Sequence, residues 1–98
     1  MTTVPSEDEA EKIAGILVAE RLAACVQILP KMTSVYVWKG ETQREAEHLL
    51  LIKTAEEKYA EVEHAISANH SYDVPEIVAI QASHVSDSYL AWITEQVA

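Results

Sequence analysis

The sharp break in pattern around Pro75 constrains the fold of this chain more than any other feature. Before it, apolar residues recur at helical spacing, which predicts a helix that runs to about Asn69 and carries the stripe Tyr59, Val62, Ala65 and Ile66. Proline lacks a backbone N–H and pushes the preceding residue toward extended geometry, so this helix cannot continue through Val74 and Pro75. The apolar run that follows predicts a strand over residues 77–81.

The rest of the chain divides into alternating helical and extended patterns. Ser6 and Glu9 form a capping box that starts a helix running to about Leu22. Alternating or continuous apolar patterns then predict strands over residues 23–29, 32–38 and 45–53. Thr54 and Glu57 are interpreted as a second capping box, and Ser86 as the cap of a short final helix.

This order of elements predicts one α+β domain over residues 1–98. A helix after the first strand and another after the third are typical of the ferredoxin-like split βαβ sandwich, written βαββαβ, here with an added C-terminal helix. The first strand is truncated, since only Met1 to Val4 precede the first helix and strands average about 5–6 residues. Both long helices are expected on one sheet face, and the other face needs a cover that oligomerisation supplies.

Composition excludes several classes of partner. Sixteen acidic against 7 basic residues give a net charge of −9, which disfavours nucleic acid and anionic membrane surfaces. No apolar run approaches the ~20 residues of a membrane-spanning helix. Cys25 is the single cysteine, which excludes an internal disulfide and indicates a reducing, cytoplasmic setting.

Four blocks in this order resemble the CutA-type divalent-cation tolerance family. They are Leu22–Val26, Tyr36–Glu41, Leu50–Thr54 and His70–Ile77, and the resemblance extends from about Val4 to Trp92. The resemblance implies a non-enzymatic homotrimer involved in the response to divalent metal cations, especially copper. It implies no organic cofactor.

The corner between helix and strand holds the candidate metal ligands His70, Asp73 and Glu76. Imidazole binds copper, zinc and nickel, and the two carboxylates add oxygen ligands. The alternative is a histidine that only caps the helix, because a lone histidine is a weak metal signature. Family copper sites are proposed to use histidines before a Pro-Tyr pair and a cysteine ending the first strand. Here the matching segments are residues 69–72 and 2–3, with one histidine and no thiol, so the resemblance implies weak binding.

Aromatic and basic residues provide a second candidate site. Tyr36, Trp38, Lys53 and Tyr72 are candidates to line a cleft between subunits, although packing at a subunit interface is the simpler role for the two hairpin aromatics. The alternative function is therefore a small-molecule sensor resembling the PII signalling proteins. An enzyme such as an acylphosphatase ranks last, because the segment Thr3–Ser6 has neither the arginine nor the glycine of a phosphate cradle.

Overall fold

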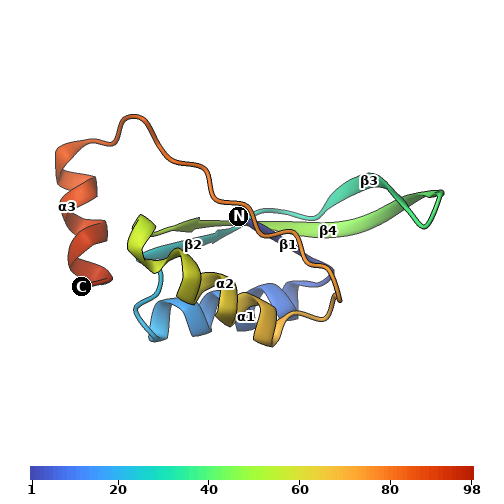
Figure 1. Cartoon of the computed structure of the whole chain (residues 1–98), viewed down its shortest axis with the longest axis horizontal. Helices are drawn as coiled ribbons and strands as arrows, with labels where there is room; N and C mark the ends of the chain where they lie inside the picture. The colour runs from blue at the N-terminus through green and yellow to red at the C-terminus, as the bar shows by residue number, and fades with distance from the viewer.

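A computed structural model describes all 98 residues, from Met1 to Ala98, as an α+β fold (Figure 1). In chain order the elements are β1 (Thr2–Val4), α1 (Glu7–Ala19), β2 (Cys25–Ile28), β3 (Met32–Trp38), β4 (Glu41–Lys53), the 3-10 turn η1 (Glu56–Lys58), α2 (Tyr59–Asn69) and α3 (Asp87–Gln96). Helices α1 and α2 lie together on one face of the sheet, and α3 lies at the end opposite the projecting β3–β4 hairpin. None of the helices has the length and apolar character that crossing a membrane requires.

The long strand β4 organises an antiparallel sheet. Its C-terminal half lies between β1 and β2, with Leu50 opposite Thr2 on one side and opposite Ile28 on the other. Its N-terminal half pairs only with β3. Strands β2 and β3 both pair with β4, and Pro30 lies in the gap between the two ladders. Residues 25–38 and 41–53 therefore form one long, interrupted hairpin that closes at Gly40, where φ is 80°. This arrangement confirms the predicted antiparallel α+β class.

The hydrophobic core lies on one side of the sheet only. Its nine buried members come from β1, α1, the segment after α1, β4 and α2; they are Val4, Ala10, Ile13, Leu17, Leu22, Ala23, Leu50, Val62 and Ile66. Along α1 the buried residues keep helical spacing, which is why that helix packs against the sheet. Only 14 of the 98 residues are buried, so a large apolar surface stays outside this core.

The predicted strand over residues 77–81 is wrong for the single chain. Ile77 makes one isolated antiparallel bridge to Thr2, and the Val78 N–H donates to the Met1 carbonyl at 3.0 Å. Beyond that point no ladder forms, and the Ile80 side chain is 73% exposed. The physical reason is the short β1, whose three residues offer too little edge for a second ladder.

The capping-box prediction is confirmed for Ser6 at the first helix, where the Glu9 side chain does not complete the box, and it is wrong at the second helix. Ser6 Oγ accepts a hydrogen bond from the Glu9 N–H at 3.2 Å, as an N-cap should. Thr54 caps nothing, because its hydroxyl donates to the Leu22 carbonyl at 2.7 Å and ties β4 to the segment after α1.

Other predicted boundaries shift. Helix α1 ends at Ala19, three residues before the expected Leu22, because Arg21 takes a left-handed backbone conformation with φ 59°. Strand β4 begins at Glu41, not at the expected Glu45. Ser86 is the N-cap residue of α3, although its side chain makes no capping hydrogen bond.

Thr2 presents a buried hydroxyl without a partner. The residue is 0% exposed, and its Oγ1 is the one buried side-chain polar atom that makes no hydrogen bond. We expect Thr2→Val to raise the free energy of unfolding by about 1–2 kcal/mol, because the change removes an unpaired polar group and nearly keeps the shape. Urea unfolding measures this, with the exposed Thr33→Val as control. An equal or lower stability of Thr2→Val would contradict the assignment.

Candidate functional site

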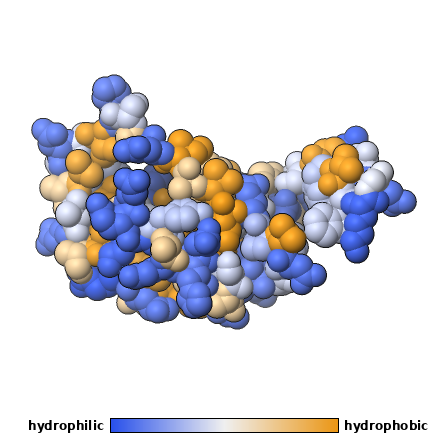
Figure 2. Space-filling view, in the orientation of Figure 1, coloured by the Kyte–Doolittle hydropathy of each residue, from blue (hydrophilic) through white to orange (hydrophobic).

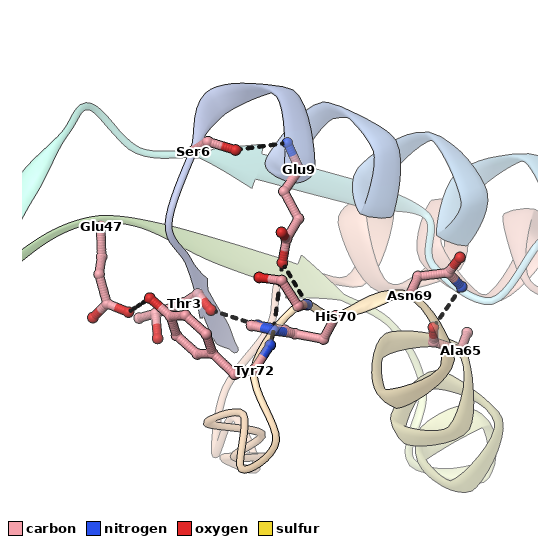
Figure 3. Close-up of polar contacts among 9 residues, drawn as sticks. Thr3, Ser6, Glu9, Glu47, Ala65, Asn69, His70 and Tyr72 are labelled. Carbon is pink, nitrogen blue, oxygen red and sulfur yellow. Dashed lines mark hydrogen bonds and ion pairs between the residues drawn. The ribbon is translucent and has the colours of Figure 1, made fainter. Parts of the chain in front are cut away.

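His70 is the centre of the polar corner after α2 (Figure 3). Its side chain is completely buried. The Nε2 atom lies 2.7 Å from the Thr3 carbonyl, and the Tyr72 N–H donates to Nδ1 at 3.0 Å. Because a carbonyl can only accept and an N–H can only donate, the imidazole is neutral with its proton on Nε2. Both ring nitrogens are therefore engaged within the chain.

Glu9 ties the corner to the first turn of α1. Its Oε2 accepts a hydrogen bond from the Ser71 N–H at 3.1 Å and lies 3.4 Å from Nδ1 of His70. At the C-terminal end of α2, the side-chain amide of Asn69 donates to the Ala65 carbonyl at 2.8 Å. Glu9 therefore does not close a capping box back onto Ser6 but reaches across to the corner (Figure 3).

Tyr72 ties the corner to β4. Its hydroxyl donates to Oε2 of Glu47 at 2.8 Å, and Glu47 is only 6% exposed. The Tyr72 ring lies against that of His70, with centroids 4.8 Å apart. Burial first, then the hydrogen bond to the Glu47 carboxylate, raises the pKa of Tyr72 well above its ordinary value. The phenol therefore stays a hydrogen-bond donor through the physiological pH range.

The structure of one chain does not bring the three predicted metal ligands together. His70 is buried with both nitrogens in use, whereas Asp73 and Glu76 are exposed. No group of three or more histidine, cysteine, aspartate or glutamate side chains is placed to hold a metal ion. The donor set of a single chain therefore does not fit a tight metal centre.

The four predicted cleft residues come together only in part within one chain, because Tyr36 and Tyr72 lie near each other whereas Trp38 and Lys53 lie far apart. Tyr36 and Tyr72 both lie near Glu45 and Glu47, and desolvation followed by these carboxylates raises the pKa of Tyr36. Trp38 lies at the hairpin tip opposite Glu41, while Lys53 lies at the other end of β4, with Nζ 5.9 Å from the centroid of the Tyr89 ring. From Glu41 to Lys53, β4 covers twelve residue steps, which span roughly 40 Å along a strand. The side chains of Trp38 and Lys53 therefore cannot share a cleft within one chain.

Sequence reasoning missed the partners that make the corner a unit, namely Thr3, Glu9 and Glu47. Glu9 was assigned to the helix cap, and Thr3 contributes only a backbone carbonyl, which leaves no side-chain signal. Glu47 did carry a signal, because it lies two residues before the apolar centre of β4 and a carboxylate in such a place needs a partner.

Large apolar side chains are exposed on three parts of the molecule. Figure 2 shows apolar groups at the tip of the projecting hairpin and over the body. The exposed members on the hairpin, the segment after Tyr72 and α3 are Val35, Tyr36, Val37, Trp38, Val74, Val78, Ile80, Val85, Tyr89, Leu90 and Trp92. Exposed large apolar side chains in groups commonly mark surfaces that contact a partner.

These features define a class: a small α+β fold with a two-helix layer, a projecting hairpin and a polar corner. A family model described as CutA1 divalent ion tolerance protein matches residues 1–96. The divalent-cation tolerance protein CutA of Thermus thermophilus is 46% identical over 95 residues, which cover 97% of this chain and 92% of that protein. This chain belongs to the CutA1 divalent ion tolerance family.

Solved structures agree with the sequence comparison. The divalent cation tolerance protein of Thermus thermophilus superposes with a TM-score of 0.96 at 45% identity, covering 99% of this chain and 94% of that one. CutA1 from Oryza sativa gives a TM-score of 0.96 at 40% identity, covering 99% and 89%. The chain spans about half the length of some curated relatives, such as the chloroplastic CutA of Arabidopsis thaliana, which is 44% identical over 91 residues that cover 93% of this chain and 50% of that protein.

Proposed function

We propose that this chain forms a cytoplasmic, non-enzymatic homotrimer that acts in tolerance of divalent cations, copper in particular, and binds them weakly. The observation that carries the proposal is the apolar surface left outside the one-sided core. Val37 at the hairpin is 67% exposed and Ile80 after the corner 73% exposed. Burial of such surface is the main favourable term in association between subunits.

A second copy would also supply hydrogen-bond partners to the backbone groups of the segment after the corner. Past its single bridge at Ile77, residues 79–81 run without a strand partner while carrying exposed apolar side chains. An unpaired extended segment of this kind readily adds a strand from another chain. Closed cyclic symmetry is the usual outcome for such subunits, and the family resemblance favours three copies, in which each interface joins two different patches of the chain.

The cation part of the proposal concerns the exposed carboxylates of the corner. Asp73 and Glu76 are open to solvent, and His70 joins them only if Nδ1 gives up the Tyr72 N–H. Losing the hydrogen bond from the Tyr72 N–H opposes metal binding by His70, which is why we expect the cation to bind weakly. The net charge of −9 attracts cations to the surface without selecting among them.

Native mass spectrometry with and without copper tests both parts. We expect a species of three chains, and bound copper that decreases in the double variant Asp73→Asn/Glu76→Gln. His84→Ala is the matched control, because His84 is exposed and lies on a different segment. A monomer at micromolar concentration would contradict the trimer, and equal copper binding by the double variant would contradict the cation site.

A further inference from the structure

The corner is hydrogen-bonded to the projecting hairpin at the root of the hairpin. Met32, the first residue of β3, pairs with Glu47 on β4. From this pair to the turn, residues 33–38 are held by pairing with residues 41–46 of β4. Figure 1 shows this part of the hairpin extending away from the helices and the rest of the sheet. The Glu47 side chain is therefore placed where the body ends and the hairpin begins.

One side-chain hydrogen bond links the corner to that root. The Tyr72 hydroxyl donates to Oε2 of Glu47 at 2.8 Å, and it is drawn with its neighbours in Figure 3. Both groups are shielded from water, since Glu47 is 6% exposed and Tyr72 half-buried. A hydrogen bond to a shielded carboxylate is stronger than one at the surface, so it can fix geometry.

The donor itself is held rigidly. The Tyr72 N–H donates to Nδ1 of His70, and His70 is in turn bonded to the Thr3 carbonyl of β1. The neighbouring Ser71 N–H donates to Glu9 of α1. The phenol therefore projects from a point that is tied to the first strand and the first helix.

We propose that the Tyr72–Glu47 hydrogen bond is a latch that fixes the direction of the hairpin relative to the body. The hairpin carries Val35, Val37 and Trp38, which are all exposed in one chain. A hairpin held in one direction presents these side chains to a second copy with less loss of conformational freedom on binding. This last step rests on the proposed homotrimer, whereas the latch itself concerns the single chain.

Hydrogen exchange at the hairpin root tests the latch. In Tyr72→Phe we expect the amides of residues 32–34 and 45–47 to exchange about tenfold faster, the size of effect typical for losing a hydrogen bond to a charged group. Amides of residues 13–17 in α1 should keep their rates. Glu47→Gln retains an acceptor oxygen and should fall between the wild type and Tyr72→Phe.

Tyr59→Phe is the matched control. Tyr59 also donates to a carboxylate, Oε2 of Glu63 at 2.7 Å, but both residues belong to α2 and the bond is exposed. Its exchange pattern should match the wild type. Unchanged rates at the root in Tyr72→Phe would overturn the latch, and so would an equal increase in α1, because that result would show a general loss of stability. Native mass spectrometry of the same samples reports the trimer separately, so a monomeric chain with a faster root would refute the proposed assembly and retain the latch.

Discussion

A chain carrying Val37→Asp is expected to remain monomeric at concentrations where the proposed trimer of the unaltered chain forms. Val37 is 67% exposed in the single chain and lies near the tip of the hairpin, so the substitution leaves the core intact. In an assembly its side chain would be covered, and an unpaired carboxylate taken out of water costs several kcal/mol. A penalty of about 3 kcal/mol per subunit weakens association by about 100-fold. Sedimentation velocity measures the result.

Ala60→Asp is the control for that experiment. Ala60 is exposed on α2, in the helical layer away from the hairpin, and an aspartate in the first turn of a helix is favourable. This variant should assemble like the unaltered chain. A trimeric Val37→Asp variant of ordinary stability would mean that the hairpin faces water in the assembly, and the proposal would lose its main support.

The second large effect is expected for His70→Ala, which should lower the free energy of unfolding by about 3–4 kcal/mol. The change leaves the buried Thr3 carbonyl and the Tyr72 N–H without partners, and each unpaired buried group costs about 1–3 kcal/mol. It also leaves a cavity where the completely buried ring packed. Urea unfolding measures this loss of stability. No metal is added, because a bound ion would itself stabilise the folded chain.

His84→Ala serves again as the control, because the exposed His84 should contribute little to stability. A loss for His70→Ala no larger than that of His84→Ala would contradict the structural role of His70. The double variant Asp73→Asn/Glu76→Gln, which alters only exposed carboxylates, should retain nearly full stability. Stability and copper binding are thereby separable at the same corner.

The residues predict the elements of this fold well where periodicity is strong. The stripe of Val62 and Ile66 places α2 on the core, and the cap at Ser6 marks the start of α1. The apolar run of the strand predicted over residues 45–53 forms the part of β4 that lies between β1 and β2. Prediction failed for residues 77–81, because an apolar run shows that a segment favours burial and does not show whether a neighbouring strand is long enough to pair with it.

At the polar corner, too, the sequence predicts the local structure but not the contacts between distant residues. Pro75 and the helix before it are enough to predict where the chain turns, and residue types alone mark His70, Tyr72 and Glu76 as chemically notable. The roles of the first two come from Thr3 and Glu47, which lie 67 and 25 residues away in the chain. Hydrogen bonds across such separations leave no periodic pattern in the sequence.

By itself, the sequence determined the local structure and the family of this protein, because helix periodicity, capping and proline act between near neighbours. The tertiary structure alone decided that His70 is a buried, neutral hydrogen-bonding residue and that the core covers one sheet face. It also decided that Trp38, paired with the first residue of β4, lies far from Lys53, the last residue of that strand. These outcomes depend on which distant groups meet when the sheet closes against its helices, and on which polar atoms then lose contact with water.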